Sequence, residues 1–481
     1  MKFTVLAIVV TLGNAFTTTT THRRRRRHPP SYTTALGSTT AAVNNIVLSP
    51  SSSDEDKFDN YAIGTPRVHR YLRDDDSDAA EYVMWYHARG TDLNSAENNL
   101  PPLSTGRIGR ATSKNGLVWE KCNLGSGSED EPGVSLGLND ESWWNFDTAH
   151  VGLGQVMLPM STPAVLAEGG VYLMYYMGGT DEETSVEQYT NTNAKVKGKT
   201  IKGMTFRIGV AMSQDGLTWG RVEGDDPTGA IMVPYDKKDP NQQWMLQQRD
   251  DDGKTPLQLE EELYCGWPEV VVNSEDNVLA VNAFANNEGS SSSSSSDNKE
   301  KNNNKNNPPP FFMYYSTMLK DCKTKAIACA VSEDGFRWFK RGTCLKPSLG
   351  EDDEAGCARC TVLKNQTYNP TTKLWENNSG TGYTMYYEGV SAEDNKHRIM
   401  AATSTDGRHW TKQGVVLDIG NEQEGGWDFN GVGSPHLLRL DDGTVRMYYT
   451  GQGKDGMTAI GIAKLEGDKM FVREAAPQLR P

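Results

Sequence analysis

The amino-acid sequence predicts an all-β protein, a five-bladed β-propeller with four antiparallel strands in each blade. Three observations support this fold class. Five short runs of aromatic, β-prone residues recur along the chain, each run is followed by a hairpin-like string, and each is preceded by a strand that starts with an acidic residue. Four-stranded units that repeat along one chain are typical of propeller blades.

The aromatic runs supply the second strand of each unit. All five carry a Met followed by two aromatic residues, a composition typical of strands. Successive Met residues lie 90, 139, 72 and 62 positions apart, and we attribute the unequal spacing to insertions in loops. The runs are VMWYHARG around Met84, LMYYMGG around Met174, FMYYSTM around Met313, TMYYEG around Met385 and RMYYTGQG around Met447.

The third and fourth strands of each unit are predicted to form a hairpin. In four units an Ile-x-x-Ala-x-Ser run leads into Asn-Gly or Asp-Gly, and a Trp follows three residues later. Because Gly tolerates a positive φ, such a pair indicates a tight turn. The Trp residues are Trp119, Trp219, Trp338 and Trp410, and Phe471 takes the equivalent place in the fifth unit.

The innermost strand of each unit starts with an acid. In four units the acid lies seven positions before a Pro or a Cys, and in the second unit Asp147 opens the run FDTAHVG, with extra residues before Pro163. The shared spacing indicates that the units are built alike. The regular pairs are Asp59 and Pro66, Glu261 (or its neighbour Glu262) and Pro268, Asp353 and Cys360, and Asp428 and Pro435.

The propeller is expected to span residues 55–475 as a single domain. Its blades cover about residues 58–122, 144–222, 261–345, 352–417 and 427–475. The innermost strand of a blade begins at the mouth of the central funnel, so the aromatic strand that follows it runs back toward the mouth. The long segments 88–106 and 178–206 follow aromatic strands and therefore belong to the mouth side. The insert 286–310 carries a serine run and an Asn/Lys run, which predicts a disordered loop on the opposite side.

Residues 1–53 predict a targeting segment, because they contain no acid and carry a charge of +6 in a chain of net charge −14. Lys2, the apolar run 3–12 and the small residues 13–15 indicate a signal peptide at 1–15. The Thr-, Ser- and Arg-rich stretch 16–53 is typical of a disordered transit peptide. A signal peptide followed by Phe16 and such a stretch resembles the bipartite plastid presequences of algae with secondary plastids, which implies a plastid protein. Entry into the secretory pathway, with a disordered basic tail, is the alternative.

Charge and motifs exclude several function classes. The excess of acidic residues argues against nucleic-acid binding. No apolar run is close to the length of a membrane-spanning helix, about 18 residues. The seven Cys are irregularly spaced, and Cys357 and Cys360 would point to opposite faces of a strand, so we expect neither a disulfide framework nor a metal site. We expect no cofactor, because no P-loop, dinucleotide-binding glycine motif or His-Glu-x-x-His is present.

The repeat with its Ser-x-Asp-Gly-x-x-Trp hairpins resembles the arabinanase/levansucrase/invertase group of glycoside hydrolases over about residues 55–475. The resemblance implies three acids at the funnel mouth: a base or nucleophile, a general acid and an orienting Asp. In the group these acids stand just before a Pro in the first three innermost strands. The strings in this chain, Gly64-Thr65-Pro66, Ser161-Thr162-Pro163 and Gly266-Trp267-Pro268, have no acid at that place.

Three other acids are candidates for catalysis. Asp59 and Asp147 lead the first two innermost strands, and we assign them as base or nucleophile and as orienting carboxylate, respectively. Glu388 follows an aromatic pair at the same rim and has no acidic counterpart in the other units, so we assign it as proton donor. Alternatively, the strand-leading acids hold blade-start turns, because equivalent positions in repeats share structural roles.

Residues that differ between units are candidates for binding. Among the residues that follow the aromatic pairs, His87 is the one imidazole and Glu388 the one carboxylate. Three of the hairpins start with Arg, which can hold sugar hydroxyls, carboxylates or phosphates. Pairing of these Arg residues with the strand-leading acids is the alternative. The predicted substrate-binding residues are His87, Arg107, His150, Arg207, Asp353, Arg359, Arg398 and Asp428.

The sequence therefore predicts a carbohydrate ligand and hydrolysis of glycosidic bonds in an oligo- or polysaccharide. The alternative is a non-catalytic propeller that binds a carbohydrate or a protein partner. Two carboxyl groups that face each other at about 5–9 Å across the funnel would favour hydrolysis. Mouth acids that are all paired with Arg side chains or backbone amides would favour binding.

Overall fold

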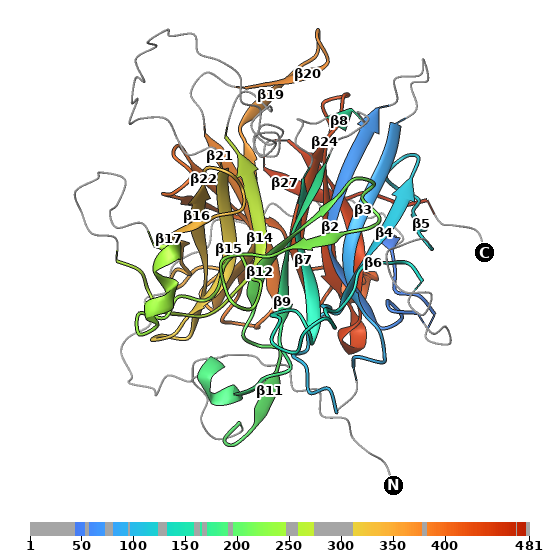
Figure 1. Cartoon of the computed structure of the whole chain (residues 1–481). Coiled ribbons are helices and arrows are strands. Elements are labelled where there is room, and N and C mark those ends of the chain that lie inside the picture. The colour runs from blue at the N-terminus through green and yellow to red at the C-terminus, as the bar shows by residue number, and fades with distance from the viewer. Residues whose placement is uncertain are drawn as a thin grey trace, which may run out of the picture.

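The computed structural model describes residues 44–52, 57–72, 80–94, 97–123, 132–157, 164–165, 171–190, 196–246, 258–273, 311–377, 382–467 and 469–477. The predicted signal peptide, most of the predicted transit segment and the insert 286–310 lie outside the described residues. The described part is almost entirely β (Figure 1). Its helical segments are the short 3-10 turns η1 (Val186–Tyr189), η2 (Pro240–Met245), η3 (Glu422–Glu424) and η4 (Lys454–Gly456).

The described strands include five units of four antiparallel strands, and pairing follows chain order within each unit. The predicted roles of the repeats are thus confirmed at the level of strands: the acid-led strand pairs with the aromatic strand, and the hairpin follows. The units are β2 (Ala62–Leu72), β3 (Ala80–Arg89), β4 (Arg107–Ser113) and β5 (Glu120–Lys121); β7 (His150–Met157), β9 (Tyr172–Gly179), β12 (Arg207–Ser213) and β13 (Gly220–Val222); β14 (Glu262–Val272), β15 (Phe311–Leu319), β16 (Thr324–Ser332) and β17 (Phe339–Leu345); β18 (Gly356–Lys364), β21 (Tyr383–Val390), β22 (His397–Ser404) and β23 (Thr411–Leu417); and β24 (Gly431–Arg439), β25 (Val445–Gln452), β26 (Thr458–Glu466) and β27 (Met470–Arg473).

Short additional strands occur beside these units. β6 (Val134–Leu136) pairs with β4, and β8 (Ala164–Val165) runs parallel to β2. Two small hairpins, β10 (Glu183–Ser185) with β11 (Thr200–Lys202) and β19 (Gln366–Asn369) with β20 (Leu374–Asn377), project at opposite ends of the molecule (Figure 1). The first belongs to the segment 178–206 that the sequence assigned to the mouth side, and we use "mouth" below for that end.

The structure corrects the expected position of the second innermost strand. β7 pairs with β9 in a register that places Gly152 opposite Met177. Gly154 therefore stands seven residues after Asp147, as Pro66 stands seven residues after Asp59. The expected alignment with Pro163, which lies outside the described residues, is wrong. The distance from Asp147, rather than a proline, makes this strand equivalent to the innermost strand of the first unit.

Part of the expected targeting segment belongs to the folded domain. β1 (Ile46–Leu48) pairs antiparallel with β26 of the fifth unit. Next to it the buried Asn45 donates hydrogen bonds to the Tyr449 hydroxyl at 2.6 Å and to the Ile462 carbonyl at 3.1 Å. The expected domain start at residue 55 is therefore wrong, because strand pairing already begins at Ile46.

The first residue of each aromatic pair connects its unit to the next. In four units it donates a hydrogen bond to the glycine carbonyl of the next hairpin turn, and these glycines have φ values of 69–81°. In the fourth unit the Tyr386 ring instead packs against Phe471, 5.6 Å away between centroids. The hydrogen bonds run from Trp85 to Gly216 (2.9 Å), Tyr175 to Gly335 (2.9 Å), Tyr314 to Gly407 (2.7 Å) and Tyr448 to Gly116 (2.9 Å), so the last one joins the fifth unit to the first.

A buried ion pair lies where the innermost strands meet. These strands contact one another in the order β2, β7, β14, β18, β24, and β24 contacts β2. Arg67 Nη2 lies 3.3 Å from Glu269 Oε2, and both side chains are almost fully buried. Arg67 also donates to the carbonyls of Gly154 and Pro435, and Glu269 accepts from the Thr361 hydroxyl at 2.8 Å. One ion pair thus contacts all five units.

Candidate functional site

Every strand-leading acid is held by the same two partners. It accepts a hydrogen bond from the second aromatic residue of its own unit, and it pairs with a Lys or Arg of the outermost strand. Asp59 accepts from the Tyr86 hydroxyl at 3.0 Å and lies 2.6 Å from Lys121 Nζ. The equivalent sets are Asp147 with Tyr176 and Arg221, Glu262 with Tyr315 and Lys340, Asp353 with Tyr387 and Lys412, and Asp428 with Tyr449 and Arg473.

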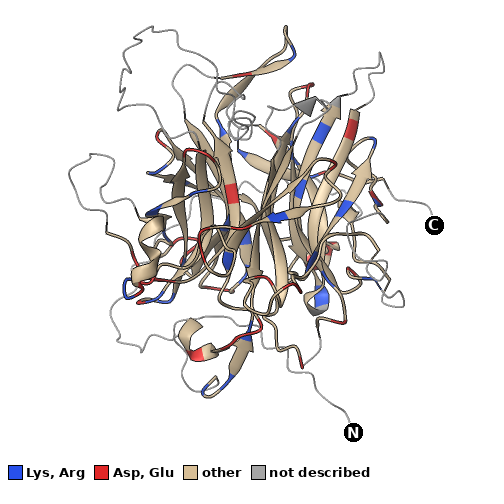
Figure 2. Ribbon diagram, viewed as in Figure 1, with Lys and Arg blue, Asp and Glu red and all other residues tan. Residues whose placement is uncertain are grey.

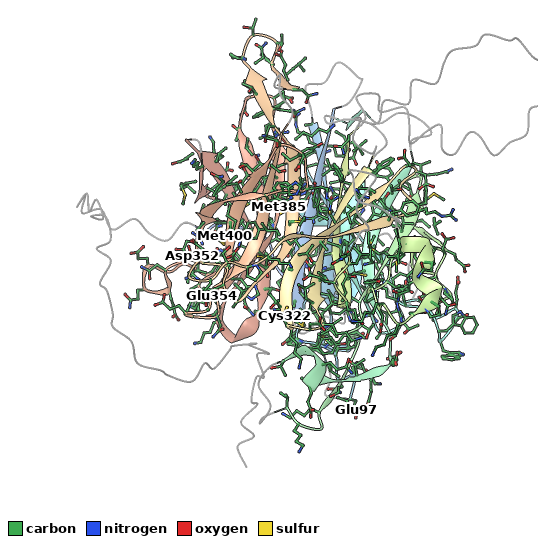
Figure 3. The ribbon with its side chains drawn as sticks, turned by 90° about the vertical axis from the view of Figure 1, so that its left-hand side faces the viewer. Glu97, Cys322, Asp352, Glu354, Met385 and Met400 are labelled. Carbon is green, nitrogen blue, oxygen red and sulfur yellow. The ribbon has the colours of Figure 1, made fainter. Side chains whose placement is uncertain are left out.

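This repetition favours the structural alternative for Asp59 and Asp147. Both carboxylates are buried, at 1% and 0% exposure, and each is paired with a base on the outermost strand, away from the strands that meet at the centre. Asp353, predicted to bind substrate, is tied in the same way, and its charged neighbours Asp352 and Glu354 lie together at the edge of the fourth unit (Figure 3). None of these acids is placed to face another across the centre.

The innermost strands carry bulges at the height of the predicted site. In all five units the register shifts between the innermost and the aromatic strand. Four bulge residues, Thr65, Trp267, Arg359 and Ser434, have positive φ values. A bulge re-aims the backbone and side chain of its residue. The bulges therefore present backbone N–H groups to the neighbouring unit.

In four of the five units the residue after the aromatic pair accepts one of these N–H groups. This explains why the position varies in chemistry, since any acceptor can serve. Met177, in the second unit, instead packs its sulfur against Gly266. The four hydrogen bonds run from Leu153 N to His87 Nδ1 (3.1 Å), Arg359 N to Ser316 Oγ (2.7 Å), Ser434 N to Glu388 Oε2 (3.2 Å) and Thr65 N to Thr450 Oγ1 (2.9 Å).

Glu388 has two further partners that a structural acceptor does not require. Its Oε1 lies 2.5 Å from His397 Nδ1, and its Oε2 lies 3.5 Å from Arg359 Nη1. The carboxylate itself is 1% exposed, whereas the side chains of Arg359 and His397 are 22% and 35% exposed. The cluster therefore reaches solvent through its arginine and its histidine.

Glu388 is ionised at neutral pH. Burial by itself would raise its pKa, but Arg359, His397 and Lys325 outweigh burial and lower the pKa to about 2. A carboxyl group with so low a pKa has no proton to donate near neutral pH. This lowered pKa does not fit the proton-donor role that the sequence suggested for Glu388, and it favours a role for the carboxylate as an anion.

His87 and His150 are buried and uncharged. His87 Nδ1 accepts the Leu153 N–H, so Nε2 carries the proton and donates to the Ser104 hydroxyl at 2.9 Å. Burial lowers the pKa of His87 well below its usual value. His150 Nε2 donates to the Gly203 carbonyl at 2.9 Å, and burial lowers its pKa to about 3. His87 thus belongs to the ring of inter-unit contacts, whereas His150 anchors a mouth-side loop.

The three hairpin-leading arginines are not part of the Glu388 cluster. Arg398 pairs with Asp394 and Asp418 at 2.8 and 2.9 Å, and Arg107 pairs with Asp92 at 2.9 Å. Neighbours along a strand point to opposite faces, so Arg398 lies on the other face of β22 from His397. Arg207 is half-buried at the start of β12. Arg107 and Arg398 therefore pair with acids, but these acids lie in loops and are not the strand-leading acids that the alternative named.

The cluster around Glu388 and Arg359 also contains His397, Lys325 and Trp267, which the sequence analysis does not single out. His397 and Lys325 occupy equivalent places, one position before Arg398 and Ala326 in the fourth and third hairpins. Trp267 lies under the Arg359 guanidinium, 4.6 Å from it to the ring centroid. A comparison of the position before each hairpin-leading residue would have shown Lys325 and His397 as the charged and titratable members of the set.

Charge is spread widely over the described surface. Acidic and basic residues occur on the turns at both ends of the strands (Figure 2). Within the ranges given above, no group of three or more His, Cys, Asp or Glu residues is arranged to hold a metal ion. The same ranges contain no helix that is long and apolar enough to cross a membrane.

Comparisons with known proteins give remote similarities. No family model matches the chain. An uncharacterized protein of Mycobacterium tuberculosis is 29% identical over 140 residues, which cover 29% of this chain and 40% of that protein. The chain thus spans less than half the length of this curated relative.

The similar solved structures include glycoside hydrolases. A glycosyl hydrolase from Bacteroides ovatus has a TM-score of 0.46 and 12% identity, covering 91% of this chain and 97% of that one. A thermostable family-43 glycoside hydrolase has a TM-score of 0.46 and 12% identity, covering 87% of this chain and 95% of that one. A third structure comes from work on the GH130 family of mannoside phosphorylases, which contains glycoside hydrolases that target β-1,2 mannosidic linkages in Candida mannan. It has a TM-score of 0.46 and 14% identity, covering 94% of this chain and 100% of that one.

The charge state of Glu388 predicts an acid-dependent loss of stability. Because its pKa is lowered to about 2 in the folded protein, its contribution is fully present above the pKa of the unfolded chain, about 4.3. That contribution is lost as the pH falls through the folded value. We expect the difference in unfolding free energy between the wild type and Glu388→Gln to shrink between about pH 4.3 and pH 2. Urea titrations of both proteins across this pH range measure this difference. A difference that stays constant would contradict a lowered pKa for Glu388.

Proposed function

We propose that the five units are the blades of a closed five-bladed β-propeller, and that the chain is a glycoside-hydrolase-like protein acting on an oligo- or polysaccharide at the mouth of the propeller. Closure is supported by the hydrogen bonds from Thr65 to Thr450 and from Tyr448 to Gly116, which join the first and fifth units. It is supported as well by the ion pair of Arg67 and Glu269, which contacts every unit.

The observation that carries the proposed activity is the contact between Glu388 and His397. The carboxylate faces Nδ1, so this nitrogen holds a proton and Nε2 of the half-exposed ring can take up another. An ionised acid that fixes the tautomer of a histidine produces an oriented general base. Hydrolysis by direct attack of water on a glycosidic bond needs a base that takes a proton from the water and an acid that gives a proton to the leaving oxygen. In this proposal His397 Nε2 takes the proton from the water, and the resulting imidazolium gives a proton to the leaving oxygen.

In this proposal the roles differ from those assigned from the sequence. His397 is the group that moves the proton, Glu388 is a positioning residue for His397, and Asp59 and Asp147 are structural. The support for the last point is that all five strand-leading acids share one set of partners, as repeated structural residues do. The arrangement with Asp59 as base or nucleophile is the competing assignment.

A non-catalytic propeller that binds a carbohydrate or protein remains the second candidate. One observation favours it: among the described residues, the strand-leading acids are paired with Lys or Arg, and Glu388 is paired with Arg359, His397 and a backbone amide. By the criterion stated above, such pairing favours binding over hydrolysis with two facing carboxyl groups. The proposed histidine base does not depend on a second free carboxyl group.

The deciding experiment measures turnover and binding on the same ligands. The full chain is incubated with a panel of neutral and acidic oligosaccharides, and new reducing ends are quantified while binding is measured by calorimetry. Release of reducing ends from at least one glycan supports hydrolysis. Binding without release moves the function to the second candidate, and a panel that shows neither contradicts a carbohydrate ligand.

For localisation we propose delivery to a plastid, with entry into the secretory pathway as the alternative. The support is the signal-like run at 3–12 followed by an acid-free basic stretch. A fluorescent reporter fused behind residues 1–43, which stop short of β1, is expected to enter the plastid, and Phe16→Ala is expected to misroute it. Microscopy of both fusions measures this. Export of the unaltered fusion to the medium would contradict plastid delivery.

A further inference from the structure

The Arg359 guanidinium is held in a fixed position, but not all of its N–H donors have an acceptor among the described residues. Its backbone is fixed by the bulge, where its N–H donates to Ser316, and its side chain lies over the Trp267 ring. On one side its Nη1 lies 3.5 Å from Glu388 Oε2, which is longer than a usual N–H···O hydrogen bond. Its Nε is buried without an acceptor among the described residues. A pre-organised arginine with spare donors at a half-exposed position is suited to an external anion.

Lys325 is a second cation beside it. It lies on β16 and packs against Gly356 of the next unit, where an added Cβ would approach the Lys325 Cβ to 2.9 Å. Its ammonium forms no hydrogen bond or ion pair within the described part of the chain, and it interacts electrostatically with Glu388 and Arg359. Burial, the larger effect, and the like charge of Arg359 lower its pKa. This lysine therefore lacks a direct anionic partner.

The local charge does not balance. Arg359 and Lys325 each contribute a positive charge, Glu388 contributes one negative charge, and His397 adds a positive charge whenever it is protonated. The excess is positive in a chain whose net charge is −14. Charges removed from water are costly unless they are paired. A bound anion would supply the missing partner for both cations, whereas a neutral sugar would not.

We propose that Arg359 and Lys325 form a subsite for a compact oxyanion, carried by the ligand as a carboxylate or sulfate group or supplied as free phosphate. This deepens the proposed function and rests on it in one respect: it places the acidic group next to His397 and so makes the substrate an acidic or phosphate-dependent glycan. Arginine offers a planar fork of donors and lysine a point charge, a combination that matches oxyanion geometry. The Trp267 ring keeps the arginine plane fixed.

Binding of defined probes to the full chain tests the subsite. Calorimetry at low salt compares inorganic phosphate, a digalacturonate, a sulfated disaccharide and a neutral disaccharide. We expect at least one oxyanion probe to bind and the neutral disaccharide to bind at least tenfold more weakly, with a loss of the difference at high salt. Phosphate binding alone identifies free phosphate as the ligand, and binding of an acidic sugar without phosphate identifies the sugar group.

Two variants and a matched control locate the effect. Lys325→Met is expected to weaken oxyanion binding at least tenfold, and Lys325→Arg, which keeps the charge, to retain most of it. Lys373→Met removes an exposed lysine in the β19–β20 hairpin at the other end of the molecule and is expected to change nothing. Unchanged binding in Lys325→Met, or equal binding of acidic and neutral sugars by the wild type, would overturn the proposal.

The outcomes separate this subsite from the proposed activity. Oxyanion binding that depends on Lys325, without turnover of any glycan, leaves the subsite standing and contradicts hydrolysis. Turnover of a neutral glycan that is insensitive to Lys325→Met supports hydrolysis and overturns the subsite.

Discussion

Replacing Glu388 by Gln is expected to lower turnover of the wild-type substrate by up to about 10²–10⁴-fold, the contribution typical of a positioned general base, because His397 loses the anion that orients it. Gln keeps the size of the side chain but loses the charge that holds the proton on His397 Nδ1. Initial rates over a range of pH values measure the change. Because Glu388 acts through His397, the variant is expected to alter the pH profile as well as the rate, which a purely structural role would not do.

Two matched variants accompany this measurement. Asp59→Asn and Asp428→Asn alter equivalent acid–Tyr–base sets in the first and fifth units. If both acids are structural, each variant loses about 1–3 kcal/mol of unfolding free energy and keeps the turnover of its folded fraction. Loss of turnover in Asp59→Asn alone would restore Asp59 as base or nucleophile. Wild-type turnover in Glu388→Gln would remove Glu388 from the mechanism.

Replacing Arg67 by Met is expected to lower the unfolding free energy by about 3–5 kcal/mol, because the change leaves Glu269 buried without its charge partner. Burial already raises the pKa of Glu269, against the opposing effect of Arg67. The arginine also donates to carbonyls of the second and fifth units, so its loss loosens contacts across the whole ring. Urea unfolding should show a lower midpoint, and an unchanged slope would locate the effect in stability.

Surface and paired variants serve as controls for the central ion pair. Lys346→Met breaks an exposed pair with Glu260 and is expected to cost less than about 1 kcal/mol. A double variant, Arg67→Met with Glu269→Leu, should recover part of the loss, since no buried charge remains, but not the hydrogen bonds to Gly154 and Pro435. An Arg67→Met protein as stable as the Lys346→Met protein would contradict a central structural role for the pair.

The repeats predicted the strands well because their signals are local. A glycine in a tight turn and a run of aromatic residues fix a hairpin and a strand within a few positions, so the four-stranded units follow from the sequence. The sequence misplaces the second innermost strand because Pro163 is not equivalent to Pro66 and Pro268, whereas the distance from Asp147 gives the observed register. β1 was missed because three residues carry little periodicity.

The site was harder to predict because its contacts join distant units. The partner of Asp59 is Lys121 on the outermost strand, a position with either Lys or Arg in the other units. Glu388 looked unusual in the sequence, yet its hydrogen bond to Ser434 is one that His87, Ser316 and Thr450 also accept in their units. Its cluster with His397, Arg359 and Lys325 depends on how two units pack, which no local pattern encodes.

The pairing of β1 with the fifth unit has a consequence for how the chain folds. Asn45 donates to the Ile462 carbonyl across 417 positions of sequence, and Trp427 Nε1 donates back to Asn45 Oδ1 at 2.7 Å. Contacts between segments so far apart form slowly, because a long loop must close before they give any stability. The fifth unit therefore cannot be completed during synthesis until its last strands have left the ribosome. Residues 44–48 must stay available until then, and a protease that removes a leader sequence has to cut before Asn45 to leave this seam intact.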